Sequence, residues 1–337
     1  MSKPDLNVGI IGYNFMGKAH SNAWLQANKF FDAPYNAVLS AACGRNEQAT
    51  REFADNWGWD AVETDWRKII ERDDIDVIDI ATPQVLHHDI AVAAAEAGKH
   101  IFCEKPMCIT SDEAKGMLAA AEKAGVRHYL NHNYRRVPAI RLARKLIDDG
   151  AVGKIYHWRC AYQQDWIVDP KFPLTWQLTK EAAGTGPHAD LNSHTVDLAH
   201  YLIGDIEDVS CTMASFIKER PIPSEGATAF SEAESGPTEM GEVTVEDTSL
   251  MHVGFTNGAI GSFEATRFAA GRRNRNTFEI YGSEGSIAFN LEQMNELQVY
   301  SRNDPPHAQG FKTILTTEPC HDYMKNWWPP GHVIGYE

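Results

Sequence analysis

The chain has 337 residues, of which 43% are hydrophobic, and this length predicts about two globular domains with cores of ordinary size. Its formal net charge of −15 and pI near 5.4 argue against nucleic acid or an anionic membrane as partner, because either would be repelled over most of the surface. The expected ligand is a small molecule.

The six cysteines are scattered without a CxxC pair, and several lie in apolar runs, which is typical of reduced thiols packed as small hydrophobes. The N-terminus runs directly into a predicted strand and lacks the charged and apolar regions of a signal peptide. No uncharged stretch is long enough to span a bilayer. These features predict a cytoplasmic protein that is neither secreted nor inserted in a membrane.

The first 135 residues alternate short apolar runs with helical segments, which is typical of a parallel sheet covered by crossover helices. The apolar runs predict strands at residues 8–11, 38–43, 77–80, 100–103 and 128–131. The intervening segments predict helices at 48–57, 89–97 and 112–124, with Ser111 as the N-cap of the last. We therefore predict a doubly wound α/β Rossmann domain over residues 1–135.

A glycine turn follows the first predicted strand. Residues 12–17 read Gly-Tyr-Asn-Phe-Met-Gly, which has the spacing of GxGxxG with Asn14 in the middle position. In the full fingerprint the glycines allow a tight turn, a close approach of the pyrophosphate and close helix packing. Two glycines at this spacing also occur in ordinary strand-to-helix turns, but the position after the first strand predicts dinucleotide binding. The candidate residues are Gly12, Asn14, Phe15, Met16 and Gly17.

The end of the second predicted strand bears on the choice of cofactor. NAD-binding domains usually carry an acidic residue there for the adenosine ribose, whereas a nearby arginine suits the 2′-phosphate of NADP. Here the strand ends in Cys43, Gly44, Arg45 and Asn46, without a carboxylate. Arg45 can stack on adenine, pair with a phosphate or lie in solvent. We therefore expect NAD(P), with a slight preference for NADP.

A lysine follows the fourth predicted strand. The apolar residues 101–103 lead directly into Glu104, Lys105 and Pro106, and the proline stiffens the turn. Ligands of open α/β sheets bind outside the carboxyl ends of the strands, so Lys105 is expected to face the ligand. The alternative is an ordinary Lys-Pro turn on the surface.

Two other strand ends carry polar residues. His87 and His88 follow Thr82 and Pro83 after the third strand, at a helix start, where helix capping is their expected role. Residues 133–136, Asn-Tyr-Arg-Arg, follow the fifth strand and also point toward the ligand crevice. An arginine pair that opens a helix is, however, more often solvated.

Beyond Gly150 the pattern changes to strands joined by glycine-containing turns, and the predicted strands are 154–164, 209–217, 244–255, 259–266, 276–281 and 286–290. Hairpins are indicated by Asn257-Gly258 and Ser283-Glu284-Gly285, and one helix is predicted at about 191–202. Residues 220–242, rich in Pro, Ser, Gly and Glu, predict a long surface loop. We therefore predict an α+β domain with a mostly antiparallel sheet over residues 136–337.

Asp190 and His194 follow a glycine stretch and are four residues apart, which on a helix places both side chains on one face. An aspartate near an imidazole stabilises its protonated form, as a general acid/base near neutral pH requires. Helix capping beside a satisfied histidine is the alternative. A zinc site of His188, Asp190 and His194 is a further one, but without nearby thiols or an HExxH pattern we expect no metal.

Residues 163–166, Gln-Gln-Asp-Trp, and Trp176 offer hydrogen bonds and a flat apolar surface, a combination that carbohydrate sites use. The alternative is that both tryptophans belong to the core.

The chain resembles the glucose–fructose oxidoreductase/inositol dehydrogenase/MocA (Gfo/Idh/MocA) family over essentially its whole length. The resemblance rests on the order and spacing of the glycine turn, Ala81-Thr82-Pro83, Glu104-Lys105-Pro106, Asn133-Tyr134-Arg135-Arg136, and Asp190 with His194. Within the family the chain is most similar to the levoglucosan (1,6-anhydroglucose) dehydrogenase branch, through Gln164-Asp165-Trp166, Asp169-Pro170, Pro173-Leu174, Trp176 and Gly335-Tyr336-Glu337.

The resemblance implies a Rossmann domain with a tightly bound nicotinamide cofactor and a sheet domain that often mediates oligomers, here a dimer or tetramer. It implies that Lys105, Asp190 and His194 are catalytic. The other candidates are Gly44, Arg45, Thr82, Pro83, His87, Glu104, Lys105 and Asn133 for the cofactor, and Tyr134, Gln164, Trp176 and Tyr336 for the substrate.

The chain departs from the family pattern in three places. Asn14 replaces the usual middle glycine, and Gly44 leaves the cofactor choice open. The chain also stops at Glu337, just after the Trp-Trp-Pro-Pro of residues 327–330, where relatives continue into terminal helices, so we expect a truncated C-terminus.

The expected reaction is hydride transfer between nicotinamide and a secondary alcohol or ketone carbon of a sugar, anhydrosugar or cyclitol. His194 would take the hydroxyl proton, Asp190 would orient and charge the imidazole, and Lys105 would stabilise the developing alkoxide. Two alternatives remain: an NAD-dependent lyase or glycosidase with transient oxidation, and a non-catalytic cofactor-binding regulator on the same fold.

Overall fold

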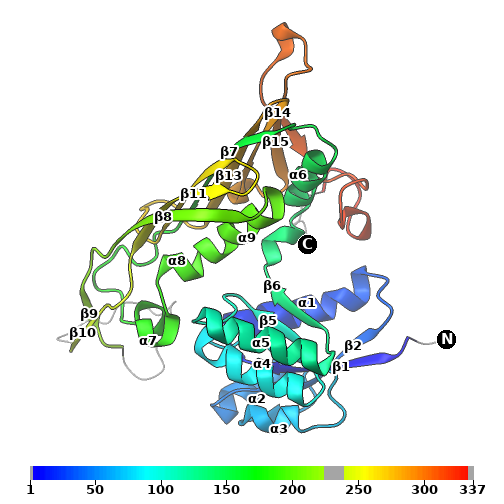
Figure 1. Cartoon of the computed structure of the whole chain (residues 1–337). Coiled ribbons are helices and arrows are strands. Elements are labelled where there is room, and N and C mark those ends of the chain that lie inside the picture. The colour runs from blue at the N-terminus through cyan, green and yellow to red at the C-terminus, as the bar shows by residue number, and fades with distance from the viewer. Residues whose placement is uncertain (1–2, 224–238, 333–337) are drawn as a thin grey trace. The chain divides into compact units, whose positions relative to one another are not determined.

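The computed structural model describes residues 3–223 and 239–332, and the chain divides into two compact units, Met1–Asn131 and His132–Glu337 (Figure 1). Each unit has a sheet and a buried core of its own. No helix within the described ranges is long and apolar enough to cross a membrane.

The first unit is built on a sheet of six parallel strands in the order β3-β2-β1-β4-β5-β6. The strands are β1 (Asp5–Ile11), β2 (Asn36–Cys43), β3 (Val62–Glu63), β4 (Val77–Ile80), β5 (His100–Glu104) and β6 (His128–Asn131). The strand order reverses at β1, between β2 and β4, so the predicted doubly wound α/β domain is confirmed. Strand β3 is too short for a periodic pattern and is absent from the predicted strands.

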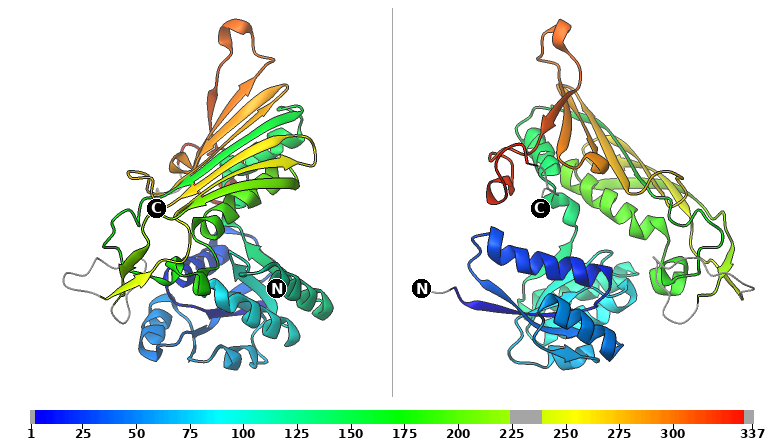
Figure 2. Two further views of the ribbon diagram at one scale, coloured as in Figure 1. Left: turned by 60° about the vertical axis from the view of Figure 1, so that its left-hand side comes forward. Right: turned by 180° about the vertical axis from the view of Figure 1, so that it is seen from behind.

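Helices cover both faces of this sheet (Figure 2). Side chains of α1 and α2 pack with Val8 and Ile10 on one face, and those of α3, α4 and α5 pack with Ile78 and Ile80 on the other. This double burial explains why the strands read as continuous apolar runs. The helices are α1 (Phe15–Phe30), α2 (Glu47–Trp57), α3 (Trp66–Ile70), η1 (Gln84–Leu86), α4 (His87–Glu96) and α5 (Ser111–Ala124).

The N-cap of α5 is Thr110 rather than the predicted Ser111, which is the first helical residue. The Thr110 hydroxyl accepts a hydrogen bond from the Glu113 amide, and the Glu113 carboxylate accepts one from the Thr110 amide. This reciprocal capping box satisfies two backbone donors and places the helix start one residue earlier than expected.

The second unit has one eight-stranded sheet in the order β16-β15-β14-β13-β7-β12-β11-β8. All its neighbouring strands are antiparallel except β7 and β12, so the predicted mostly antiparallel sheet is confirmed. The strands are β7 (Ile155–Gln163), β8 (Ile206–Ala214), β11 (Thr248–Phe255), β12 (Ile260–Thr266), β13 (Arg275–Gly282), β14 (Gly285–Asn290), β15 (Glu296–Ser301) and β16 (Lys312–Leu315).

Both predicted hairpins form, β11 with β12 and β13 with β14, and Gly258 takes the φ of +84° that the first turn requires. Strands β15 and β16 extend the sheet beyond the strands predicted from the sequence. The helices of this unit are η2 (Asn133–Arg136), α6 (Pro138–Asp148), η3 (Trp176–Leu178), α7 (Lys180–Ala183), α8 (Pro187–Asp190), α9 (Asn192–Leu202), η4 (Leu291–Gln293), η5 (Pro306–Ala308) and η6 (Met324–Asn326).

The predicted surface loop at 220–242 is wrong at both of its ends. β9 (Glu219–Pro221) and β10 (Met240–Glu242) form an antiparallel pair, and residues 224–238 lie outside the described ranges. Arg220, the first residue of the predicted surface loop, is fully buried. Its guanidinium donates to the carbonyls of Ile167, Asp169 and Phe172, which explains how the chain tolerates a cation there.

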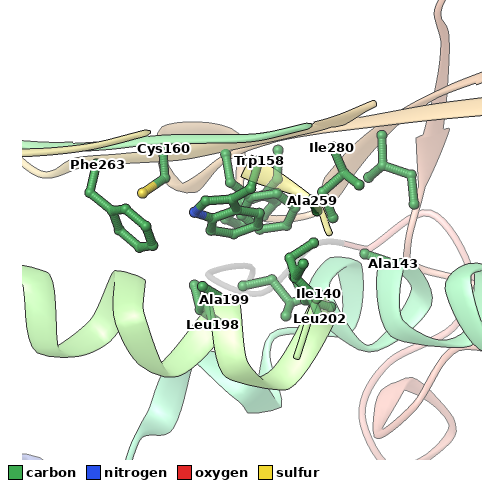
Figure 3. Close-up of a cluster of buried hydrophobic side chains, with 14 of the residues drawn as sticks. Ile140, Ala143, Trp158, Cys160, Leu198, Ala199, Leu202, Ala259, Phe263 and Ile280 are labelled. Carbon is green, nitrogen blue, oxygen red and sulfur yellow. The ribbon is translucent and has the colours of Figure 1, made fainter. Parts of the chain in front are cut away.

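The core of the second unit lies between the sheet and the helices α6 and α9 (Figure 3). Trp158 of β7 is fully buried at its centre and stacks on Phe278, with 5.2 Å between the ring centroids. Ile140 comes from α6, and Leu198 and Leu202 come from α9. This packing fixes α9, the helix that carries His194.

We expect Trp158→Ala to lower the free energy of unfolding of the second unit by about 3–5 kcal/mol, because it removes a large, fully buried ring. Urea denaturation followed by circular dichroism measures the loss. Tyr156→Ala, on the same strand but 53% exposed, is the matched control, with an expected change of less than about 0.5 kcal/mol. A loss below about 1 kcal/mol for Trp158→Ala would contradict the described core.

Candidate functional site

The glycine turn lies between β1 and α1, at the carboxyl edge of the parallel sheet. Gly12 has φ +115°, and a Cβ at this position would lie 2.4 Å from the carbonyl oxygen of Ala81. A Cβ on Gly17 would lie 2.2 Å from the carbonyl oxygen of Gly12. Both glycines are therefore required for the close approach of backbone segments that a dinucleotide turn uses.

Helix α1 begins at Phe15, directly after this turn. Asn14 is its N-cap, and within the described part of the chain the Asn14 side chain makes no capping hydrogen bond. Asn14 and Phe15 are exposed, and Met16 is half-buried. The start of a 16-residue helix presents backbone N–H groups, which suit a pyrophosphate. Asn14 thus replaces the middle glycine without preventing the turn or the helix.

Gly44 follows β2 and packs against the first glycine turn. A Cβ on Gly44 would lie 2.1 Å from the ring of Tyr13, so the tyrosine occupies the space that a side chain would need. Arg45 is exposed, and the side chain of Asn46 caps α2 by accepting from the Ala49 amide. Steric fit to Tyr13 therefore explains the glycine after the second strand.

His87 connects two strand ends and does not cap a helix as expected. It is buried, and its Nδ1 and Nε2 each lie 2.9 Å from a carbonyl oxygen, of Pro106 and of Thr82 respectively. Burial lowers the pKa of His87, so the ring is neutral and donates to one of these oxygens at a time. The Thr82 hydroxyl oxygen is buried and, among the described residues, has no hydrogen-bond partner.

Lys105 directly follows β5, as predicted, and its peptide bond to Pro106 is cis. The preceding Glu104 is buried, and its Oε2 accepts a hydrogen bond of 3.1 Å from the Lys105 amide. The carboxylate therefore holds the backbone from which the lysine side chain extends. Lys105 itself is half-buried.

His194 lies in an aromatic cluster of the second unit. It is buried on α9, and its ring lies 4.5 Å from that of Tyr134 and 5.9 Å from that of Tyr162, measured between centroids. The Tyr162 hydroxyl donates to Asn274 Oδ1 at 2.8 Å, so the 2.8 Å contact between the two tyrosine hydroxyls has Tyr134 as donor. Burial, followed by Tyr134, raises the pKa of Tyr162, which keeps that hydroxyl protonated.

Asp190 and His194 do not share one continuous helix. Asp190 ends the short helix α8, Leu191 interrupts, and α9 begins at Asn192. The carboxylate of Asp190 accepts a hydrogen bond of 2.7 Å from Arg267, whose guanidinium is only 1% exposed. This charge-assisted hydrogen bond from a buried arginine therefore fixes the orientation of the Asp190 carboxylate.

The residues proposed for carbohydrate contact form a hydrogen-bonded series. Trp166 Nε1 donates to Gln164 Oε1 at 2.8 Å, and Gln164 Nε2 donates to Asn274 Oδ1 at 2.8 Å. Trp166 is half-buried, whereas Trp176 is 43% exposed and does not belong to the core. Tyr336 lies outside the described residues.

The segment after β6 is only partly solvated. Asn133 is exposed, and Tyr134 joins the aromatic cluster. Arg135 forms two hydrogen bonds with Asp197, of 2.7 and 2.6 Å, which contradicts the alternative that both arginines are merely solvated. Arg136 donates to the hydroxyl of Tyr323.

Among the described residues, no three His, Cys, Asp or Glu side chains form a group that could hold a metal ion. His188, the third ligand of the zinc alternative, lies with its Nδ1 3.2 Å from the Ser249 hydroxyl.

Comparison with known proteins identifies the family. Residues 6–132 match the family model described as "Oxidoreductase family, NAD-binding Rossmann fold", and residues 140–288 match the GFO/IDH/MocA C-terminal domain. The chain is 46% identical over 334 residues to levoglucosan dehydrogenase of Pseudarthrobacter phenanthrenivorans, a match that covers 98% of the chain and 85% of that protein. The chain belongs to the Gfo/Idh/MocA family.

Two solved structures are similar to this chain in fold as well as in sequence. An oxidoreductase domain protein from Kribbella flavida has a TM-score of 0.92 and 48% identity, with 99% of this chain and 86% of that one covered. A levoglucosan dehydrogenase in complex with NADH and levoglucosan has a TM-score of 0.92 and 44% identity, with 98% and 86% covered. The resemblance inferred from the sequence motifs, including the branch, is confirmed.

The first unit of this Gfo/Idh/MocA protein is thus an NAD-binding Rossmann domain, and its residues fit the dinucleotide. Gly12 and Gly17 leave no room for side chains at the turn, and the buried Thr82 hydroxyl, which none of the described residues bonds, can bond a polar group of a ligand. The slight preference for NADP finds no support, because the family model is NAD-binding and the related structure holds NADH.

Sequence reasoning missed several residues of the Gfo/Idh/MocA site. Tyr13 belongs to the glycine motif, but no role was predicted for it. It packs against Gly44 only because the ends of β1 and β2 are neighbours in the sheet. Arg267 and Asn274 lie 77 residues from Asp190 and 112 from Tyr162, respectively, so no local pattern connects them. The available signal was an arginine directly after the predicted strand 259–266.

Proposed function

We propose that this chain is an NAD-dependent dehydrogenase of levoglucosan or a closely similar anhydrosugar. The observation that carries the proposal is the 46% identity to levoglucosan dehydrogenase over 98% of the chain. The likeness to a solved levoglucosan dehydrogenase that holds NADH and levoglucosan supports the same cofactor and substrate class.

The second unit supplies groups suited to a rigid sugar. Sugar hydroxyls require fixed donors and acceptors, and sugar C–H faces pack on aromatic rings. The series from Trp166 through Gln164 and Asn274 to Tyr162 holds its polar groups in place by hydrogen bonds. We propose Tyr134, Gln164 and Trp176 as substrate contacts, together with Tyr336.

The proposed mechanism assigns one role to each catalytic residue. The nicotinamide accepts the hydride from the substrate carbon. His194 takes the proton of the hydroxyl being oxidised, and the Lys105 ammonium donates a hydrogen bond to the same oxygen as negative charge develops there. Asp190, held by Arg267, orients the neutral imidazole and stabilises the imidazolium that forms when His194 takes the proton.

For the cofactor, we propose that the pyrophosphate binds at the turn of Gly12, Asn14, Phe15, Met16 and Gly17. Gly44 and Arg45 would border the adenosine, and the remaining contacts are proposed for Thr82, Pro83, His87, Glu104, Lys105 and Asn133. NAD is the proposed cofactor rather than NADP.

The test is a spectrophotometric screen of levoglucosan, glucose and myo-inositol, each with NAD and with NADP, and with product analysis of every mixture. We expect accumulation of NADH with levoglucosan, and a kcat/KM that exceeds those for glucose and myo-inositol by at least about tenfold, because a fixed set of polar groups rejects sugars that leave it unpaired. A higher kcat/KM with NADP than with NAD would overturn the cofactor assignment.

The same screen separates the two alternatives. Cleavage of a glycoside without net NADH would favour the lyase or glycosidase. NADH binding without turnover of any sugar would favour the regulator.

We also propose a dimer or tetramer formed through the outer face of the eight-stranded sheet. Leu250 and Ile260 lie on that face and are 47% and 63% exposed, which supports burial against another copy. The scattered cysteines support the cytoplasm as the compartment.

A further inference from the structure

A buried histidine joins three elements of the first unit, next to the strand end that carries Lys105. His20 lies on α1, Asp79 on β4 and Glu104 at the end of β5. The Nδ1 of His20 lies 2.8 Å from Asp79 Oδ1, and its Nε2 lies 3.0 Å from Glu104 Oε1. Asn131 of β6 completes the group, since its Nδ2 donates to Glu104 Oε1 at 2.6 Å.

The hydrogen bonds determine the protonation of this group. A neutral imidazole has one N–H donor, and an ionised carboxylate has none. Both ring nitrogens of His20 face carboxylate oxygens, so with both carboxylates ionised the two contacts are satisfied together only when the ring is an imidazolium. Asn131 and His20 then donate to the same oxygen of Glu104, which suits an ionised carboxylate.

Burial makes this charge pattern necessary. His20, Asp79 and Glu104 are 5%, 0% and 4% exposed, and two buried carboxylates need a cation between them. The other groups that face the imidazole are the aromatic ring of Phe102 and the amide of Asn131. Lys105 is the next charge, beside Glu104.

The pKa shifts of His20 and Glu104 both favour the charged pair that the hydrogen bonds indicate. Burial alone lowers the pKa of His20, but Asp79 and then Glu104 outweigh it and raise the pKa to about 10. Burial likewise opposes ionisation of Glu104, yet the hydrogen bond and charge of His20 lower its pKa.

The group reaches Lys105 through the second oxygen of the same carboxylate. Glu104 Oε1 accepts from His20 and Asn131, and its Oε2 accepts from the backbone amide of Lys105. The carboxylate is thus fixed at both oxygens, between helix α1 and the first residue after β5. Without the imidazolium, Glu104 loses its counterion and the hydrogen bond that orients it.

We propose that His20 is a positioning residue, which as an imidazolium bridges Asp79 and Glu104 and thereby holds the backbone of Lys105 in its working position. This inference rests on the proposed role of Lys105 as the donor to the reacting oxygen. His20 touches neither substrate nor cofactor in this role.

The first test compares His20→Gln with His88→Gln, a control at a half-buried histidine of the same unit. We expect His20→Gln to lower kcat for levoglucosan oxidation at least about tenfold and to change the sugar KM less than about threefold, because the Lys105 contact strengthens in the transition state. The pKa of Glu104 rises in this variant, so the ratio of its kcat to that of the parent falls further as the pH becomes acidic. His88→Gln should match the parent.

Charge compensation separates positioning from packing. His20→Gln leaves two buried carboxylates without a cation, and adding Asp79→Asn removes one of them. We expect the double variant to recover at least about threefold in kcat over His20→Gln, a coupling that a double-mutant cycle measures. If His20→Gln does not fold, Glu104→Gln carries the test, with an expected loss of at least about tenfold in kcat.

Two readouts do not depend on the reaction. Histidine ¹⁵N NMR should show one ring, identified by its absence in His20→Gln, with both nitrogens protonated at pH 8. Hydrogen exchange should show faster exchange of the Lys105 amide in His20→Gln than in the parent. These results can hold even if no sugar is oxidised, so they distinguish failure of this inference from failure of the proposed function.

A neutral His20 ring at pH 8 would overturn the inference. So would normal kcat in both His20→Gln and Glu104→Gln, or a double variant that is no more active than His20→Gln.

Discussion

Lys105→Met is expected to lower kcat for levoglucosan oxidation by about 10²–10³-fold, the loss typical of removing one donor to a developing oxyanion. Methionine keeps an unbranched apolar side chain but removes the ammonium. The Glu104 carboxylate still accepts the backbone amide at this position, so the turn keeps its support. The Kd for NADH, measured by fluorescence titration, should change less than about threefold, because Lys105 is one of many proposed cofactor contacts and its bond to the reacting oxygen strengthens in the transition state.

Lys115→Met is the control for this substitution. Lys115 lies on α5 of the same unit, and its ion pair with Asp112 is exposed, so its removal should leave kcat unchanged. Lys105→Met with a kcat within about tenfold of the parent would remove Lys105 from the mechanism.

His194→Gln is expected to lower kcat by about 10²–10⁴-fold, the usual contribution of a general acid/base. The amide cannot take a proton from the substrate near neutral pH. Because His194 is buried against Tyr134, circular dichroism must show an unchanged fold before the loss is assigned to chemistry.

The matched control is His200→Gln, on the same helix but half-exposed, with an expected kcat equal to that of the parent. Comparable kcat values for His194→Gln and His200→Gln would exclude His194 as the base. Pre-steady-state measurement of NADH formation identifies which step has slowed.

The elements of the fold that were predictable are those whose buried residues form a regular pattern along the sequence. The parallel strands are buried on both faces and therefore appear as apolar runs, which placed Lys105 at a strand end. β3 and the end of the chain after Asn290 lacked such a signal: β3 has two residues, and β16 is mostly exposed.

The support of the candidate site was not predictable in the same way. His20 contacts Asn131, which lies 111 residues away in the sequence, and Asp190 accepts a hydrogen bond from Arg267, which lies 77 residues away. Such contacts depend on which helices and strands become neighbours in the fold, which no local spacing specifies. The break at Leu191 is a similar case, because the four-residue spacing of Asp190 and His194 suits a continuous helix that the chain does not form.

The parallel pairing of β7 with β12 has a consequence for how the second unit reaches its folded state. β7 ends at Gln163, yet its two neighbours in the sheet, β12 and β13, begin only at Ile260 and Arg275. During synthesis β7, with its Trp158, leaves the ribosome long before β12 or β13. All residues of the first unit have been synthesised by then. Closing so long a loop costs chain entropy before any contact compensates it. The second unit therefore folds late, and β7 stays unpaired until β12 and β13 have been synthesised.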